Sequence, residues 1–391
     1  MSSSADVTIA DALAQARALL SRNLVAEGIL AASPTERAQK RHYTRIFGRD
    51  AAICALGMAV SGEPALVEGA RRGLHTLADH QADNGQIPKY VDPAQSLADF
   101  WYVGCIDSTL WWLIAVYWLD RHTQGERLAM ELAESVQKAL TWLHCQEHPQ
   151  LCLLQQNEAS DWADIMPRSG YVLYTNALWY YVKCLYDLPR AEDTKYHFNH
   201  LFYPYSREVP DYRRLRLLQH YVRQRGEYSE LYLSFVNFSF WGAEGDVLGN
   251  LLAVLFGLAD EVPACRILRA LRRAQVAQPY PIRAVVTPIE QSTALWRPYM
   301  GRHRQNLAFQ YHNGGVWPFI GGFWVLALAR YEDARSATQA LLDVARVNSL
   351  NGWEFNEWFH GRTGVASGMV GQSWNAAMLL LAHRGLQTRL F

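Results

Sequence analysis

The chain has 391 residues, half of them hydrophobic, which is enough for one large core or two ordinary domains. Lys plus Arg and Asp plus Glu each number 37, so the formal net charge is zero. This balance excludes the basic surface typical of nucleic-acid-binding proteins and a polybasic segment for anionic membranes.

The N-terminal residues and the cysteines are typical of an intracellular protein. Residues 1–7 are polar and lack the basic and apolar regions of a signal peptide, and no apolar run is long enough for a transmembrane helix. The six cysteines have no C-x-x-C spacing and lie in or beside apolar stretches, so we expect buried free thiols. We therefore predict a cytoplasmic location.

Helical periodicity dominates the chain. The segments with this periodicity are, in chain order, 8–22, 48–62, 64–81, 107–122, 126–146, 171–188, 209–222, 246–258, 262–275, 315–330, 332–349 and 369–385. Strand-like sequence is sparse, and residues 230–236 and 283–287 are candidates for short hairpins within loops. We predict an all-α protein of twelve helices.

The connections between these helices alternate in length. Tight turns follow the second, fourth, eighth and tenth helices, and the connection near 189–208 is the exception. The long connections are 23–47, 82–106, 147–170, 223–245, 276–314 and 350–368. In an antiparallel array, alternate connections emerge on the same face, so we expect the long loops to share one end of the molecule, where functional residues usually lie.

Twelve antiparallel helices, six inner and six outer, describe an (α/α)6 barrel. We expect residues 1–391 to form a single catalytic domain with this architecture and with its long loops on one face. An α-helical solenoid is the alternative, but no fixed repeat period supports it.

Aromatic residues are frequent in the long loops. The chain has 14 Trp, 20 Tyr and 14 Phe, and many of them lie beside Gly, Asn and carboxylates. Aromatic rings stack on the apolar C–H faces of sugars, so the composition favours a small carbohydrate as the partner of this neutral protein. A core that is rich in tryptophan is the other interpretation. A homo-oligomer is compatible with the sequence.

Two of the long loops carry acids flanked by tryptophan. Asp161 and Asp164 lie around Trp162, and Glu354 and Glu357 lie in the last long loop. Glycoside hydrolysis needs one protonated carboxyl at the leaving oxygen and one ionised carboxylate that activates water or attacks carbon. One acid from each loop would supply both groups if the barrel brings them to one mouth. A single such acid is more often an N-cap or a surface charge.

Other residues of the long loops are candidates for sugar binding. Arg49 and Asp50 lie at the start of the second predicted helix and are candidates for sugar ligands or for an inter-helix ion pair. Asp107 lies at the start of the fourth predicted helix, and its alternative role is that of an N-cap. His312 is a candidate substrate contact or a capping residue. The remaining candidates are Trp101, Trp162, Asn176, Trp241, Asn313, Trp317, Glu354, Trp358, Gln372 and Trp374.

Motifs of other catalytic sites are missing from the sequence. There is no H-E-x-x-H, no C-x-x-C and no close set of His and carboxylate ligands, so we expect no metal. There is also no G-x-S-x-G elbow and no glycine-rich phosphate-binding motif, so we expect no cofactor. The alternatives to hydrolysis are a sugar epimerase with paired histidines such as His312 and His360, a phosphorolytic enzyme, and a non-catalytic sugar-binding barrel.

Four motifs, spread in order over the chain, also occur together in a known family. They are Tyr43-Thr-Arg-Ile-Phe-Gly-Arg-Asp50, Ile106-Asp-Ser-Thr-Leu-Trp-Trp112, Asp246-Val-Leu-Gly-Asn250 and Tyr311-His-Asn-Gly-Gly-Val-Trp-Pro318. They resemble motifs of the alkaline/neutral invertase family and, more distantly, of the amylo-α-1,6-glucosidase domain of glycogen debranching enzymes. The resemblance spans about residues 43–375, nearly the whole chain.

This resemblance implies an (α/α)6 barrel and an inverting glycoside hydrolase. It assigns the general acid to Asp164 and the general base to Glu357. Inversion would put the two carboxyl groups roughly 6.5–9.5 Å apart. Burial near Trp162 would raise the pKa of Asp164, whereas Glu357 would remain ionised.

The substrate implied is a small glucoside cleaved by an exo-acting enzyme. Sucrose is the first candidate and an α-1,6-linked glucoside is the second. The segment that follows the acid, Asp164-Ile-Met-Pro-Arg-Ser-Gly170, differs from the Asp-Arg-Arg-Met-Gly of invertases.

Overall fold

The structure is a computed structural model of the chain and is mainly helical, with a few short strands. The residues that it describes are 7–100, 105–123, 127–205, 220–224, 228–237 and 240–391.

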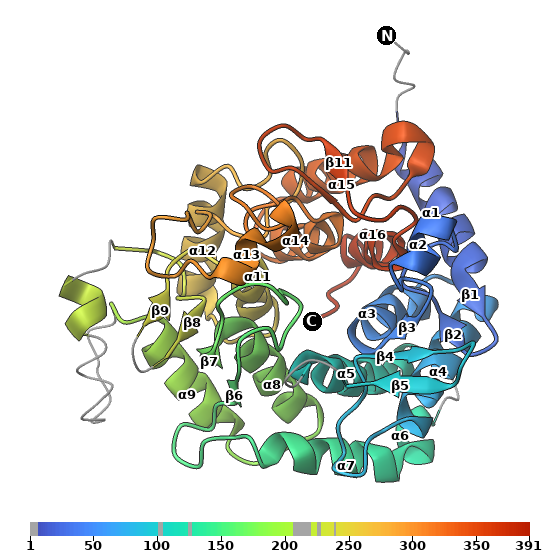
Figure 1. Ribbon diagram of the computed structural model, residues 1–391, viewed down its shortest axis with the longest axis horizontal. Coiled ribbons are helices and arrows are strands. Elements are labelled where there is room, and N and C mark those ends of the chain that lie inside the picture. The colour runs from blue at the N-terminus through green and yellow to red at the C-terminus, as the bar shows by residue number, and fades with distance from the viewer. Residues whose placement is uncertain (1–6, 101–104, 124–126, 206–219, 225–227, 238–239) are drawn as a thin grey trace.

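An inner ring of helices surrounds the centre of the molecule (Figure 1). In chain order these helices are α3 (Gly48–Ala59), α5 (Ile106–His122), α8 (Leu173–Leu185), α11 (Val247–Leu255), α14 (Pro318–Tyr331) and α16 (Ser373–Gly385). Each helix contacts the next, and α16 contacts α3, so the ring is closed. Residues 247–255 of α11 are buried without exception, because an inner helix is covered by neighbours on every side.

The outer helices pack against the inner ring. In chain order they are α1 (Ile9–Asn23), α4 (Pro64–Asp79), α7 (Ala133–His144), α9 (Ala191–Phe202), α12 (Glu261–Arg273) and α15 (Ala334–Trp353). These helices are amphipathic: α12 buries Ala264, Ile267, Leu268 and Leu271, which lie on one helical face, and exposes most of its charged residues. Shorter helices lie in the connections: α2 (Glu36–Lys40), α6 (Leu128–Glu131) and α13 (Pro298–Gly301).

One outer helix differs from the sequence-based prediction. Residues 191–202, predicted to be part of a long connection, form α9, whereas most of the predicted helix 209–222 lies outside the described residues. The buried face of α9 includes Thr194 and His197 beside three apolar residues, and these polar side chains interrupt the apolar periodicity. With α9 in place, the α8–α9 connection is as short as the other tight turns, and the exception in the predicted alternation disappears.

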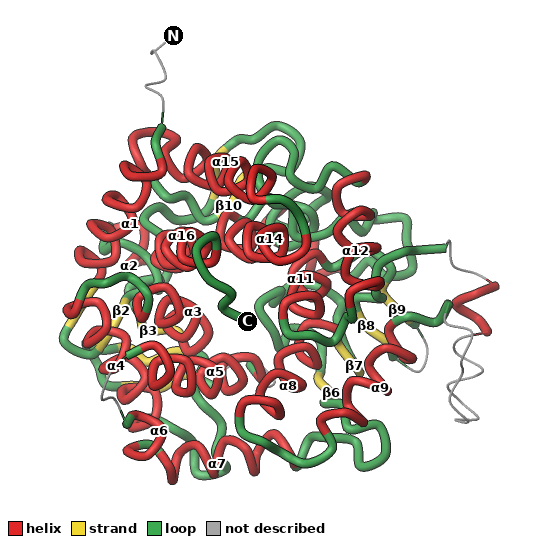
Figure 2. Tube along the Cα trace, turned by 180° about the vertical axis from the view of Figure 1, so that it is seen from behind, coloured by secondary structure: helices red, strands yellow, loops and turns green. Residues whose placement is uncertain are grey.

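The long connections gather at one end of the molecule, as predicted. A long connection precedes each inner helix, so these loops lie where the inner helices begin. At the opposite end, the C-terminal Phe391 packs on the rings of Trp118, Tyr181 and Phe256 near the ends of α5, α8 and α11 (Figure 2). The two ends of the ring therefore have different roles: one is closed by apolar packing and the other carries the polar loops.

Short strands brace the long loops. The strands β3 (Ile46–Phe47), β4 (Tyr90–Asp92) and β5 (Leu97–Asp99) form an antiparallel sheet. A second sheet consists of β6 (Gln155–Gln156), β7 (Gly170–Val172), β8 (Phe235–Val236) and β9 (Trp241–Gly242), and two hairpins pair β1 (Leu24–Val25) with β2 (Gly28–Ile29) and β10 (Trp358–Phe359) with β11 (Ala366–Ser367). Of the predicted strand 230–236, only residues 235–236 form a strand, β8, and residues 283–287 form only isolated bridges to other loops.

The cysteines are free thiols, but not all of them are buried. The prediction of burial is wrong for three of them, because Cys145 and Cys184 are exposed and Cys265 in α12 is only partly buried. Cys145 and Cys184 differ most from the prediction. Each lies at the C-terminal end of a helix, where the chain turns toward solvent. Among the described residues, no helix combines the length and hydrophobicity needed to cross a bilayer.

The contact between α3 and α16 depends on a glycine. A Cβ atom on Gly57 would lie only 2.0 Å from the carbonyl oxygen of Ala377 in α16. We expect Gly57→Ala to lower the free energy of unfolding by about 1–3 kcal/mol, measured by urea unfolding, because the two helices must move apart. The control is Gly73→Ala in α4, where the nearest atom to the new Cβ would be 3.6 Å away. Equal stability of the two variants would contradict the close approach.

Candidate active site

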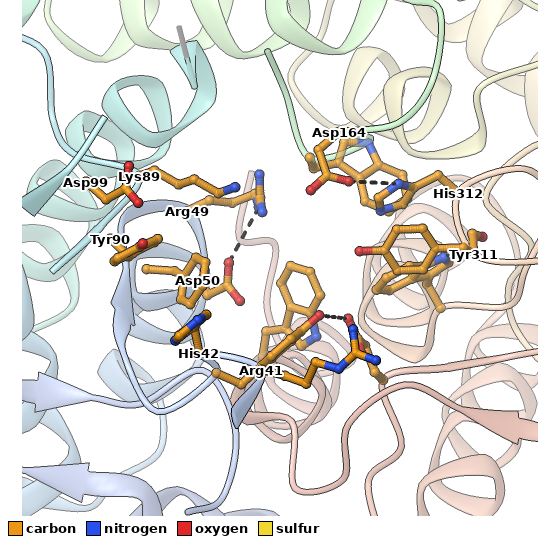
Figure 3. A pocket seen from close by; sticks show the side chains of 16 residues that line it. Arg41, His42, Arg49, Asp50, Lys89, Tyr90, Asp99, Asp164, Tyr311 and His312 are labelled. Carbon is orange, nitrogen blue, oxygen red and sulfur yellow. Dashed lines mark hydrogen bonds and ion pairs between the residues drawn. The ribbon is translucent and has the colours of Figure 1, made fainter. Parts of the chain in front are cut away.

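A pocket opens at the loop-bearing end of the ring, where α3, α14 and α16 begin (Figure 3). Its volume is about 420 Å³, within the range of small-molecule sites. The residues that line it are Arg41, His42, Tyr43, Phe47, Arg49, Asp50, Lys89, Tyr90, Asp99, Trp162, Asp164, Tyr311, His312, Trp317, Glu357 and Trp374. Both predicted catalytic acids, Asp164 and Glu357, are among them, although 193 residues separate them in the sequence.

Glu357 lies just before β10, and both of its carboxylate oxygens accept a hydrogen bond. The Tyr43 hydroxyl donates a hydrogen bond to Oε1 (2.7 Å), and the Met369 backbone N–H donates to Oε2 (2.9 Å). Gly368 leaves room for this carboxylate, because a Cβ there would lie 2.3 Å from Oε2.

The pKa of Glu357 is higher than expected. Burial raises it to about 7, and the charges of Asp50 and Asp164 add to the increase, while the hydrogen bonds from Tyr43 and Met369 oppose it. Burial thus acts against the ionised form that we predict for Glu357, and the hydrogen bonds from Tyr43 and Met369 act in its favour.

Asp164 lies in the loop between β6 and β7 and keeps 26% of its side chain exposed. Asn306 anchors the loop by donating a hydrogen bond to the carbonyl oxygen of Ile165 (2.7 Å). Burial raises the pKa of Asp164, as predicted, while the positive charges of Lys89 and Arg49 oppose this effect. A carboxyl that retains its proton is suited to act as a general acid.

The neighbouring acids of both loops have structural roles. Asp161 accepts hydrogen bonds from the Gln156 amide (2.9 Å) and from the Ala163 backbone N–H (2.8 Å), and it does not line the pocket. Glu354 accepts hydrogen bonds from the amides of Asn351 and Asn356 on Oε2, also outside the lining. Of the alternatives left open by the sequence, this geometry favours Asp164 and Glu357.

His312 stands beside Asp164, with Nδ1 3.5 Å from Oδ1 (Figure 3). Burial lowers the pKa of His312 well below its ordinary value, and the positive charges of Arg168 and Arg49 lower it further. The imidazole is therefore neutral, and its contact with Asp164 is not an ion pair. Its ring stacks on Trp317 at 5.1 Å between centroids, which fixes its orientation.

Arg49 and Asp50 open α3 at the floor of the pocket. Arg49 donates a hydrogen bond to Asp107 (3.0 Å), and its Nε lies 3.5 Å from the Asp50 carboxylate. Asp107 is fully buried and also accepts a hydrogen bond from Tyr174 (3.1 Å), so it supports Arg49 from behind instead of facing the pocket. Arg49 thus forms an inter-helix ion pair with Asp107, and Arg49 and Asp50 also line the pocket, where contact with a sugar remains a prediction.

Tryptophans form one wall. Trp162 and Trp317 pack edge to face, with 5.5 Å between their centroids, and Trp374 stacks on Phe319 at 4.1 Å. All three tryptophans are at least 95% buried, so most of their surface packs within this cluster and the remainder lines the pocket. These tryptophans therefore belong to the core and also line the pocket, and their contact with a sugar remains a prediction.

The opposite wall consists of residues that sequence analysis did not single out. The register of the first sheet aligns Phe47 with Tyr90 and Tyr90 with Asp99, and all three line the pocket beside Lys89. The other lining residues that the sequence analysis did not predict are Arg41, His42, Tyr43 and Tyr311. Tyr43 and Tyr311 lie within the motifs of the sequence analysis, but residues 89–99 have no recognisable motif, and only strand pairing brings them to the site.

Several predicted sugar ligands lie away from the pocket. Asn176 bonds to the backbone of Leu154 and Val172, and Asn313 bonds to both backbone groups of Ile289, so both fasten loops. The other residues outside the lining are Trp241, half-buried in β9, Trp358, buried in β10, and Gln372, buried at the start of α16. Trp101 lies outside the described residues.

Within the described part of the chain, no group of three or more His, Cys, Asp or Glu side chains is arranged to bind a metal ion. The pocket lining supplies four carboxyl groups, three tyrosine hydroxyls and two imidazoles, together with the basic side chains of Arg41, Arg49 and Lys89.

Residues 174–388, more than half of the chain, match the family described as alkaline and neutral invertase. The chain belongs to this family of glycoside hydrolases. Glu357 lies within the matched range, and Asp164 lies ten residues before it.

Plant invertases are among the relatives of this family member. The chain is 29% identical over 147 residues to probable alkaline/neutral invertase D of Arabidopsis thaliana and to cytosolic invertase 1 of Oryza sativa subsp. japonica. These alignments cover 36% of this chain and 26% and 25%, respectively, of the two plant proteins, so the chain matches about a quarter of their length.

Solved structures align with almost the whole length of this chain. The GH63 mannosylglycerate hydrolase from Thermus thermophilus, in a complex with Tris and D-glycerate, has a TM-score of 0.65 and 15% identity, over 95% of this chain and 99% of that one. A glycosidase structure has a TM-score of 0.62 and 16% identity, over 97% of each chain. At this identity, the likeness concerns the fold.

Proposed function

We propose that this invertase-family protein is an exo-acting, inverting glycoside hydrolase that cleaves a small glucoside, with Asp164 as general acid and Glu357 as general base. The observation that carries the proposal is that both carboxyl groups line one aromatic pocket, although they come from distant loops. The closed ring of inner helices, each with an outer partner, supports a single (α/α)6 barrel over residues 1–391 as the scaffold.

The reaction follows from the two environments. Glu357 removes a proton from a water molecule, whose oxygen attacks the anomeric carbon while the bond to the leaving oxygen breaks. Asp164 gives its proton to that oxygen, so the products are the free sugar and the protonated aglycone. Burial raises the pKa of both carboxyl groups, which favours the acid form of Asp164, and at Glu357 the hydrogen bonds from Tyr43 and Met369 oppose this effect and stabilise the base form.

The stereochemistry of the product tests the mechanism. The two carboxyl groups should lie roughly 6.5–9.5 Å apart, which leaves room for the water. Proton NMR of the first turnovers on an α-glucoside should therefore show β-glucose before mutarotation. Initial release of α-glucose would rule out a single displacement.

Sucrose is the first candidate substrate and an α-1,6-linked glucoside such as isomaltose is the second. The plant relatives named as invertases support the first candidate. Assays with sucrose, trehalose, isomaltose and panose, with release of glucose as the readout, distinguish them. Turnover that requires phosphate would instead indicate a phosphorolytic enzyme, and binding without product would indicate a non-catalytic barrel.

A glucoside with an acidic aglycone is a second candidate class, because basic side chains line part of the pocket. Arg41 and Lys89 are two of these residues (Figure 3). Within the described residues, the Arg41 guanidinium forms no ion pair. The structural neighbour named mannosylglycerate hydrolase was solved with D-glycerate. Faster hydrolysis of glucosylglycerate than of the neutral glucosylglycerol, and loss of this preference in Arg41→Gln, would support this class.

The hydrogen bond from Tyr43 should set the acidic limb of the pH profile. This bond lowers the pKa of Glu357, so Tyr43→Phe should raise that pKa above its value of about 7. Because the base must be ionised, activity rises with pH through this pKa, and the variant should reach full activity only at a higher pH. The pH dependence of kcat/KM, which reports the free enzyme, measures the shift. An unmoved or lowered limb would contradict this role of Tyr43.

An epimerase has less support from the geometry. His312 lines the pocket, but His360 does not, and its ring nitrogen accepts hydrogen bonds from the backbone N–H groups of Arg362 and Thr363. The cytoplasmic location remains a prediction, since the matched relatives include cytosolic, chloroplastic and mitochondrial invertases.

A further inference from the structure

A buried charge cluster lies behind the pocket, outside its lining. The Arg168 guanidinium is 3.2 Å from Asp246 and 3.7 Å from Glu244, and all three side chains are at least 98% buried. Arg168 is the fourth residue after Asp164 in the same loop, and Asp246 is the residue at which α11 starts. The cluster therefore joins the loop of the proposed acid to the inner ring.

The loop has anchors on both sides of Asp164. On the N-terminal side, Asp161 holds the backbone of Ala163. On the C-terminal side, Asn306 holds Ile165, and Arg168 reaches the acids at the start of α11. The loop is thus clamped within four residues of the carboxyl group, which limits the positions that the carboxyl can take.

The cluster also acts electrostatically at the site. Arg168 helps to keep His312 uncharged, and His312 contacts Asp164. Burial raises the pKa of Glu244 and that of Asp246, the latter to about 6, while Arg168 opposes both changes. Two buried acids share one buried guanidinium, so removal of Arg168 alone would leave their charges without a cation.

We propose that Arg168, clamped between Glu244 and Asp246, is a positioning residue that holds the Asp164 carboxyl group at the leaving oxygen. This inference rests on the proposed role of Asp164. It makes a selective prediction: a misplaced acid slows only those substrates whose leaving group must be protonated. Fluoride leaves without protonation, so α-glucosyl fluoride needs the base and the pocket but not the acid.

The test compares two substrates in variants of Arg168. In Arg168→Met we expect kcat on the preferred glucoside to fall by about 10²-fold, with KM little changed and with hydrolysis of α-glucosyl fluoride retained. Arg168→Lys should recover part of kcat, because it keeps the positive charge. Equal losses on both substrates would overturn the proposal, since they indicate a general distortion of the pocket.

A second variant covers the case that Arg168→Met does not fold. The triple variant Arg168→Met, Glu244→Gln, Asp246→Asn removes the whole cluster and leaves no buried unpaired charge. It should show the same selective loss, and an unchanged kcat on the glucoside would overturn the proposal. The control is Arg190→Met, which removes an exposed ion pair with Asp193 and should change neither rate.

Asp164→Asn distinguishes a failure of the positioning role of Arg168 from a failure of the proposed function. If this variant shows the selective loss and the Arg168 variants do not, the positioning role is wrong and the proposed function stands. If Asp164→Asn itself hydrolyses both substrates at the wild-type rate, the proposed function fails.

Discussion

Glu357→Gln is expected to lower kcat by about 10²–10⁴-fold on every glycoside, because an amide cannot remove a proton from the attacking water. The loss should also extend to α-glucosyl fluoride, since water must be activated whatever group leaves. The change keeps the size of the side chain and its acceptor oxygen for Tyr43. Steady-state kinetics on both substrates, with thermal unfolding as a check of the fold, measures the effect.

Glu354→Gln is the matched control for this variant. Glu354 lies three residues away in the same loop and bonds to Asn351 and Asn356 outside the pocket. Its replacement should leave kcat near the wild-type value. If Glu354→Gln abolishes activity and Glu357→Gln does not, the assignment of the base is wrong.

Asp164→Asn is expected to lower kcat by about 10²–10⁴-fold on sucrose or another alkyl glucoside, but to leave α-glucosyl fluoride hydrolysis nearly intact. The asparagine cannot donate the proton that a sugar alkoxide needs in order to leave.

The comparison of the two variants identifies each role. Loss of fluoride hydrolysis in Glu357→Gln and its retention in Asp164→Asn is the expected pattern. The reverse pattern would exchange acid and base. Isothermal titration with glucose should show that both variants still bind the sugar, so that a loss of rate is not mistaken for a loss of binding.

Most of the helices were predictable because their signals are local. Inner helices such as α11 and α14 are apolar on all sides, and α12 repeats its buried residues at helical spacing. The sequence analysis missed α9 because polar side chains are buried on its inner face and interrupt the apolar periodicity. Thr194 there accepts a hydrogen bond from Lys183 and donates one to the carbonyl oxygen of Cys152, so a polar residue occupies a core position.

Acids beside tryptophan in long loops form a pattern that a single sequence reveals, but this pattern left Asp161 and Glu354 as alternatives, and the family resemblance selected Asp164 and Glu357. Asn176 and Asn313 lie in equally polar motifs, yet they fasten loops. Spacing along the chain does not distinguish a side chain that faces a pocket from one that bonds to a nearby backbone, because both positions favour the same residue types.

The sequence alone determined the helical class, the gathering of long loops at one end, the family resemblance and the candidate acids. Each of these depends on local periodicity or on a motif within one loop. Only the tertiary structure decided that Lys89, Tyr90 and Asp99 reach the pocket, that Arg168 braces the loop of Asp164, and that the pKa of Glu357 rises to about 7. These features arise from strand register and from burial among residues distant in the chain, which have no local signature.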